Sequence, residues 1–134
     1  MRIFFTVQGE GRGHLTQALA VQQTLSRWGH EVVGVVAGQP GHRTLPEFFA
    51  QAFPVPVHSL PSPAFALRGD RSVDVAATVW RAARGVPRYR AAVRELGGLI
   101  EEARPDLLLN FFEPLTGILK LVRPIRVPVV SIAH

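Results

Sequence analysis

Apolar residues form two patterns that alternate along this chain. Nearly continuous apolar runs predict buried strands at residues 2–7, 31–36 and 107–112, and shorter runs predict two more near 55–59 and 127–132. A run that is apolar at consecutive positions buries both faces of its strand. These segments are therefore typical of a parallel sheet that is covered on both sides.

Between these runs, apolar residues recur at helical spacing. A first helix is predicted to begin near His14 or Leu15 and to stop at Gly29, with one apolar face made by Ala18, Val21, Leu25 and Trp28. Shorter helices are predicted near 43–52 and 114–122.

The middle of the chain is predicted to contain a loop at 60–72, followed by helices near 73–84 and 87–103. Pro87 suits the first turn of the second of these helices. That helix has an apolar stripe made by Tyr89, Val93, Leu96, Ile100 and Ala103.

Strands that alternate with helices predict a single α/β domain with a Rossmann-like parallel sheet flanked by helices. In such sheets, ligands bind beyond the carboxyl ends of the strands. The candidate site therefore consists of the loops that follow the predicted strands: 8–14, 37–42, 60–72, 110–114 and 133–134.

The composition of the 134 residues, 47% hydrophobic and 19% charged, is that of a globular protein. Because there is no cysteine, a disulfide framework and a thiolate metal site are excluded. The five histidines show no ligand spacing, so a metal site is not supported, and no cofactor is expected. No signal peptide or membrane-spanning run of about 18–20 apolar residues is visible, which favours a cytoplasmic protein.

The net charge of +5 comes from one segment, because residues 64–94 contain seven arginines and two aspartates while the rest is balanced. Such a segment attracts anionic partners. Arg81, Arg84 and Arg88 recur at helical spacing, which suits either contact with an anionic membrane or a solvated helix face. No nucleic-acid-binding motif accompanies the arginines, so a nucleic-acid partner is not expected.

A glycine-rich segment, Gly9 to His14, lies between the first strand and the first helix. Glycine there permits positive φ and close approach of a ligand, and the helix N-terminus favours an anion. The segment is not a P-loop, because Gly13 is followed by His14 and Leu15 instead of Lys and Ser or Thr. It also lacks the third glycine of a dinucleotide fingerprint and the acidic residue after the second strand.

Residues 11–20, Gly-Arg-Gly-His-Leu-Thr-Gln-Ala-Leu-Ala, resemble the Gly-x-Gly-His loop that opens GT-B glycosyltransferases, among them the peptidoglycan N-acetylglucosaminyltransferases and UDP-glucuronosyltransferase-like enzymes. Gln17 stands where many members have proline, which points to a less characterised branch. Residues 105–115 are similar to the Pro-Asp-strand-Phe-Glu-Pro segment of that branch. Residues 28–32 and 128–132 also resemble its strand entries, whereas residues 40–104 show no clear resemblance.

The resemblance implies that residues 1–134 form the N-terminal, acceptor-type half of a GT-B fold. The C-terminal domain, which binds the nucleotide-sugar donor (a UDP-sugar above all), would be absent from this chain. The chain alone would then be inactive. A lipid-linked acceptor would place the protein at the inner face of the membrane.

His14 is the first catalytic candidate that the resemblance implies. Imidazole can remove the proton of an acceptor hydroxyl, and a helix N-terminus disfavours its charged form. A structural, helix-capping histidine is the competing interpretation. Glu113, which follows the fourth strand, is a second candidate base or acceptor ligand, or else the N-cap of the next helix.

Further residues are expected to contact the substrate because of their place in the resemblance or after a strand: Gly11, Arg12, Gly13, Thr16 and His134. The competing interpretation of Arg12 is an arginine exposed to solvent, and that of His134 is a frayed chain terminus. A non-enzymatic α/β module that binds a nucleotide or a phosphorylated ligand through the glycine loop is the alternative function.

Overall fold

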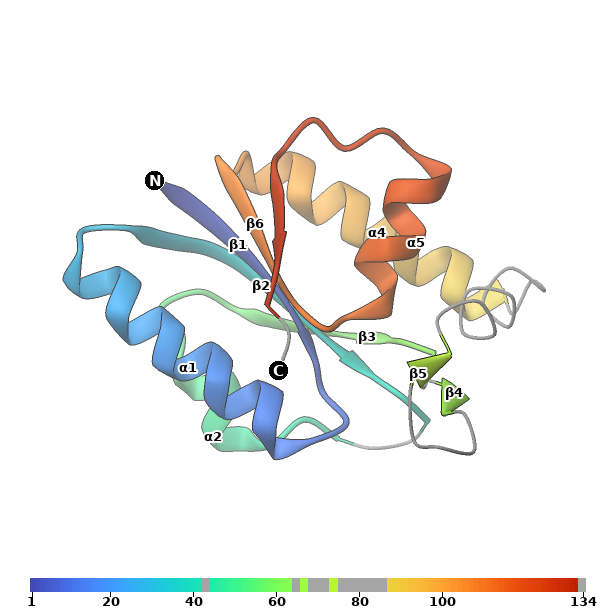
Figure 1. Ribbon diagram of the computed structural model, residues 1–134, viewed down its shortest axis with the longest axis horizontal. Coiled ribbons are helices and arrows are strands. Elements are labelled where there is room, and N and C mark those ends of the chain that lie inside the picture. Colours follow the sequence, from blue (N-terminus) through green and yellow to red (C-terminus); the bar gives the residue numbers. More distant parts are fainter. Residues whose placement is uncertain (42–43, 64–65, 68–72, 75–86, 133–134) are drawn as a thin grey trace.

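The computed structural model describes residues 1–41, 44–63, 66–67, 73–74 and 87–132. Its centre is a parallel sheet in the order β3-β2-β1-β6-β7 (Figure 1). The strands are β1 (Arg2–Gln8), β2 (Glu31–Gln39), β3 (Val57–Pro61), β6 (Leu107–Phe111) and β7 (Val129–Ser131).

Helices cover both faces of this sheet. On one side lie α1 (Arg12–Arg27) and α2 (Glu47–Gln51), and on the other lie α4 (Pro87–Ala103) and α5 (Pro114–Val122) (Figure 1). The α/β, Rossmann-like class predicted from the sequence is therefore confirmed.

Two cores result from this arrangement, because successive residues of β1 point to opposite faces. Phe5 belongs to the core under α1 and α2, whereas Phe4 belongs to the core under α4 and α5. The predicted stripe of α4 is confirmed, since Val93, Leu96 and Ile100 are buried in this second core.

The C-terminus of α1 explains one error of the sequence analysis. Gly29 has a φ of 81°, and His30 N–H donates to the Leu25 carbonyl, which is a Schellman ending. Trp28 therefore lies at the C-cap, where its side chain is 72% exposed. The prediction that Trp28 extends the buried face was wrong because the helix ends before its ring can pack.

The N-terminus of α1 and the ends of several other elements also differ from the predictions. The helix begins at Arg12, because Gly11 takes the extended N-cap conformation, with φ −131° and ψ 155°. β2 extends to Gln39. α2 starts only after Pro46, because the helical conformation is sterically unfavourable for the residue that precedes a proline. Likewise β3 begins after Pro56, which has no N–H for the sheet.

The predictions for the middle of the chain need a further correction. β4 (Ala66–Leu67) and β5 (Val73–Asp74) pair antiparallel, and β3 extends to Pro61. The loop expected at 60–72 therefore contains strand residues, and the helix expected at 73–84 does not begin at 73. Backbone pairing between two short extended segments prevails there over helical spacing. The remainder of that expected helix lies outside the described residues.

Candidate active site

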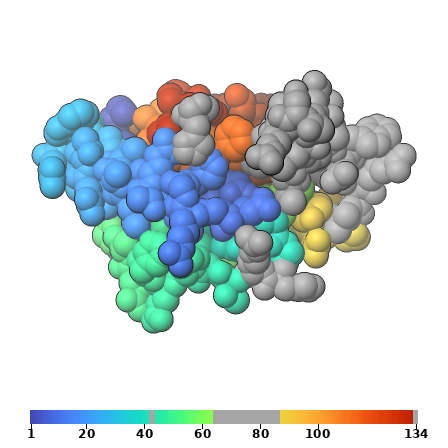
Figure 2. Space-filling view, turned by 60° about the horizontal axis from the view of Figure 1, so that its bottom comes forward, coloured from blue at the N-terminus to red at the C-terminus, as the bar shows by residue number. Residues whose placement is uncertain are grey.

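The carboxyl ends of β1 and β6 lie side by side, at the place where ligands bind in parallel sheets of this class. The chain moves outward from β1 through β2 to β3, then returns to place β6 on the other side of β1. Such a reversal of strand order opens a crevice between the two loops that leave the adjacent strands. Blue atoms of the N-terminal part and orange atoms of the β6–α5 region reach the same face of the molecule (Figure 2).

His14 and Phe112 meet at this switch point. His14 is the third residue of α1, and Phe112 directly follows β6. Their rings are stacked, with centroids 5.5 Å apart and planes inclined by 13°. The half-buried His14 therefore lies where the sequence placed the site, next to an aromatic side chain that the sequence analysis did not single out.

The glycine segment is built differently from its prediction. Gly13 lies inside α1, and Gly11 does not use a positive φ. Gly9 N–H donates to the Gly38 carbonyl at 2.8 Å, and a Cβ at position 9 would collide with the Gln39 amide. Internal packing therefore requires a glycine at position 9, whereas a Cβ at Gly11 would meet nothing within 4 Å.

Glu113 is 1% exposed and caps α5. Its Oε1 accepts hydrogen bonds from Leu115 N–H at 3.0 Å and from the Ser62 hydroxyl. Desolvation by burial raises the pKa of Glu113 from 4.5 to about 7, although both hydrogen bonds favour the carboxylate. The structure thus shows the capping role, and the same carboxyl group titrates near neutral pH.

Asn110 organises the turn between β6 and α5. Its Oδ1 accepts a hydrogen bond from Glu113 N–H at 2.9 Å and another from the Thr6 hydroxyl at 3.0 Å. Thr6 in turn accepts from the Thr116 hydroxyl at 2.8 Å. Because both threonines are buried, this chain of hydrogen bonds fixes the backbone that carries Phe112 and Glu113.

Gln39 and Ser62 border the candidate site and are not among the residues predicted from the sequence. Ser62 N–H donates to the Gln39 carbonyl at 3.1 Å, which brings the end of β3 to the end of β2. Gln39 is 5% exposed, and within the described part of the chain its side-chain amide has no hydrogen-bond partner. Both residues lie in loops or strand ends that were expected to border the site, and polar character at those positions was the available signal.

The remaining predicted residues lie at the surface or outside the described ranges. Arg12, Gly11 and Gly13 are exposed around the start of α1, and Thr16 donates to the Arg12 carbonyl at 2.8 Å. The prediction for His134 falls outside the described residues.

The predicted basic stripe of Arg81, Arg84 and Arg88 lies only partly within the described residues. Arg81 and Arg84 lie outside it, while Arg88 is exposed, with its guanidinium carbon 4.9 Å from the centre of the Tyr89 ring. None of the helices in the described ranges is long and apolar enough to cross a membrane.

The N-terminus of α1 contributes to the electrostatics of this edge of the sheet. Its N-cap glycine offers no side-chain hydrogen bond, and its first turn contains no acidic residue. The partial positive charge of the helix end is therefore not offset within that turn, which suits an anionic or strongly polar ligand. Across residues 1–41, 44–63 and 87–132, no three His, Asp or Glu side chains gather in a way that could hold a metal.

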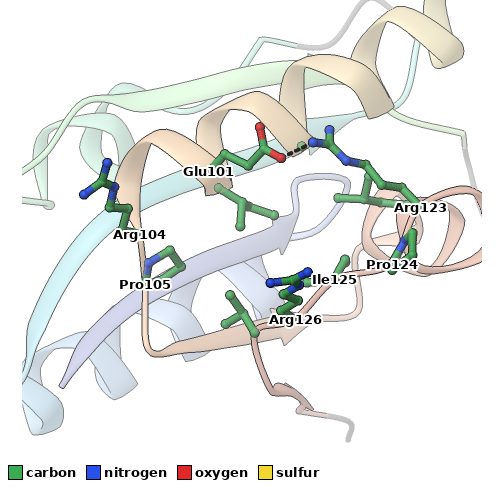
Figure 3. Close-up of a pocket in the computed structure, with 11 residues that line it drawn as sticks. Glu101, Arg104, Pro105, Arg123, Pro124, Ile125 and Arg126 are labelled. Carbon is green, nitrogen blue, oxygen red and sulfur yellow. Dashed lines mark hydrogen bonds and ion pairs between the residues drawn. The ribbon is translucent and has the colours of Figure 1, made fainter.

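A pocket of about 250 Å³ lies at the opposite edge of the sheet, before β6 and β7 (Figure 3). Arg104 follows α4, and Arg123 follows α5 and pairs with Glu101. Positive side chains at these two positions offset the negative ends of both helices. Arg104 and Arg123 therefore have a structural explanation that is independent of the candidate site.

Comparisons with known proteins agree with this geometry. The fold is similar to that of Acinetobacter baumannii MurG, with a TM-score of 0.57 and 17% identity over 97% of this chain and 34% of the other. It is also similar to apo UGT2 of Phytolacca americana, with a TM-score of 0.54 and 18% identity over 97% of this chain and 28% of the other.

The chain thus spans about a third of the length of these solved structures. Among curated proteins, none matches its sequence. A family model described as glycosyl transferase family 1 matches residues 1–134. This match covers the complete chain and confirms the resemblance to GT-B enzymes, so the protein belongs to glycosyl transferase family 1.

Proposed function

We propose that this chain is the N-terminal, acceptor-binding part of a glycosyltransferase that transfers a sugar from a nucleotide-sugar donor to a hydroxyl group. The family match over residues 1–134 carries this proposal. The donor-binding domain would lie outside these residues, which agrees with the greater length of both structural neighbours. We expect the 134-residue chain to be inactive until that domain is supplied.

In this reaction the acceptor oxygen bonds to the anomeric carbon, the bond from that carbon to the donor phosphate breaks, and the nucleotide leaves. The acceptor proton must pass to a base as the new bond forms. His14 is the proposed base, supported by its place at the switch point and at a helix N-terminus. Gly11, Arg12, Gly13 and Thr16, around the start of the same helix, are proposed to contact the acceptor.

Glu113 is the second candidate base. Its pKa of about 7 would let it exchange a proton at neutral pH, but its burial leaves only Oε2 without a partner among the described residues. We propose that an acceptor hydroxyl reaches it only if the crevice opens. His134 remains a proposed contact after β7.

The test uses the full-length protein with UDP-sugars and a panel of hydroxyl acceptors, and it measures UDP release. His14→Asn should lower kcat at least about 100-fold, as loss of a general base does. The matched control is His58→Asn, an exposed histidine of β3, which should leave kcat unchanged. Glu113→Gln is assayed in parallel to separate the two candidate bases.

The outcomes of this test are distinct. Unchanged turnover in His14→Asn would exclude His14 as the general base. A large loss of turnover only in Glu113→Gln would indicate that Glu113 is the base instead. If no nucleotide sugar is turned over while the 134-residue chain alone binds a nucleotide or a phosphorylated compound, the non-enzymatic module is the better function.

The proposed partners are a UDP-sugar, a lipid-linked acceptor and the anionic inner face of a membrane, contacted through Arg81, Arg84 and Arg88. Each basic residue near such a surface contributes about 1 kcal/mol. Vesicles with anionic lipid should therefore retain the protein at low salt and release it at high salt. Equal retention on neutral vesicles would exclude the electrostatic contact.

A further inference from the structure

The stacked pair of His14 and Phe112 joins two segments that are distant in the sequence. His14 comes from the first turn of α1, and Phe112 from the turn after β6. Their planes are inclined by only 13°, and the centroid distance of 5.5 Å makes this an offset stack in which the phenyl ring covers part of one face of the imidazole. An offset stack is one of the favourable arrangements of two aromatic rings, so this contact stabilises the orientation that the imidazole has here.

Phe112 is held in a backbone conformation that does not suit it. Its φ is 61°, in the left-handed region where glycine and asparagine are tolerated and a bulky side chain is unfavourable. If the turn alone mattered, glycine would serve better at this position. Contacts of the phenyl ring are therefore needed to offset the unfavourable backbone, and its stacking on His14 is one of them.

The surrounding structure fixes this conformation from both sides. Before Phe112, the buried Phe111 pairs in register with Val7 of β1. After it, Glu113 donates its N–H to Asn110 Oδ1, and its carboxylate accepts from Leu115 N–H. The backbone at position 112 is thus determined by its neighbours, so the phenyl ring has a fixed place from which to orient a partner.

We propose that Phe112 is a positioning residue whose ring holds the His14 imidazole in one orientation at the switch point. In the proposed transfer reaction, this orientation would keep one ring nitrogen directed at the acceptor hydroxyl. The catalytic consequence rests on the proposed function, whereas the positioning of the ring is a property of this chain alone.

The positioning is tested by NMR on the 134-residue chain. The ring current of a phenyl ring at this distance changes the chemical shifts of the Hδ2 and Hε1 protons of His14. Phe112→Asn and Phe112→Gly both suit a left-handed φ and remove the ring, so they should keep the fold and lose this shift. Phe112→Tyr keeps the ring and should retain it. Unchanged His14 signals in a folded Asn or Gly variant would overturn the proposal.

The catalytic consequence is tested in the full-length protein. Phe112→Asn should lower kcat about 10–100-fold with little change in KM, because a misplaced base loses orientation while substrate binding persists. Phe112→Tyr should restore most of the turnover. In a His14→Asn background, Phe112→Asn should cause no further loss.

Two results separate the positioning role of Phe112 from the proposed transferase function. An equal loss in the His14→Asn background would show that Phe112 acts independently of His14 and would overturn the proposal. If the wild-type protein turns over no nucleotide sugar, the proposed function fails, and the NMR result still decides whether Phe112 positions His14.

Discussion

The carboxyl group of Glu113 occupies the space that a side chain at Gly38 would fill. A Cβ built at position 38 would overlap both carboxyl oxygens of Glu113, of which Oε1 accepts a hydrogen bond from the Ser62 hydroxyl. The end of β2 and the N-cap of α5 therefore fit together only because residue 38 has no side chain. This contact links three strand ends at the candidate site.

Replacing Gly38 by alanine should destabilise the protein by about 1–3 kcal/mol, as overpacking of a buried site does. Because Glu113 is enclosed, it cannot move aside without losing its bonds to Ser62 and Leu115. Urea unfolding of Gly38→Ala measures this cost. A variant as stable as the wild type would mean that the carboxyl group has room to shift.

The buried carboxyl group of Glu113 should make stability depend on pH. Its pKa is about 7 in the folded protein, compared with the ordinary value of 4.5 for a glutamate side chain, so between these values the folded state holds the proton more tightly. Stability should therefore fall as pH rises from about 4.5 to 7, by about 3 kcal/mol in total. Above that window this group adds no further slope.

Glu113→Gln isolates this effect, since an amide does not titrate and its oxygen can still accept from Ser62 and Leu115. The stability difference between variant and wild type should shift in favour of the variant as pH rises from 4.5 to 8. The exposed Glu95→Gln serves as the control, and its difference should stay nearly constant. A flat difference for Glu113→Gln as well would contradict the raised pKa.

Asn110 should be more sensitive than its partial exposure suggests. Asn110→Ala leaves the Thr6 hydroxyl and Glu113 N–H without their acceptor, at a cost of about 2–4 kcal/mol for two unpaired donors. Asn110→Asp keeps an acceptor oxygen and should lose less. Thermal unfolding of both variants provides the comparison, and equal losses would show that the hydrogen bonds contribute little.

Two adjacent glycines of α4 should respond differently to alanine. A Cβ at Gly98 meets nothing within 4 Å, so Gly98→Ala should stabilise the helix by about 0.5–1 kcal/mol. At Gly97 a Cβ would lie 2.9 Å from Arg123 Nη1, and Arg123 pairs with Glu101. Gly97→Ala should therefore gain less or lose stability. Matched melting curves test this order, and a reversed order would disprove it.

The sequence predicted where the candidate site residues lie along the elements, but not which side chains they contact. The sequence placed His14 at the start of a helix and Glu113 after a buried strand, and the structure has both there. Ser62 could not be paired with Glu113 in advance, since the two are 51 positions apart. Phe112 was read as the last residue of a strand, and its left-handed φ has no signal in a run of apolar residues.

By itself, the sequence determined the α/β class, the buried strands, the span of α4 and the stop at Gly29. Those features depend on local periodicity and on glycine and proline, whose effects act over a few residues. The tertiary structure decided the order of the strands and hence which loops meet. It thereby brought Gly38 against Glu113 and Phe112 against His14. Such contacts depend on how parallel strands assemble, because pairing between distant segments is set by the packing of the complete sheet and not by local spacing.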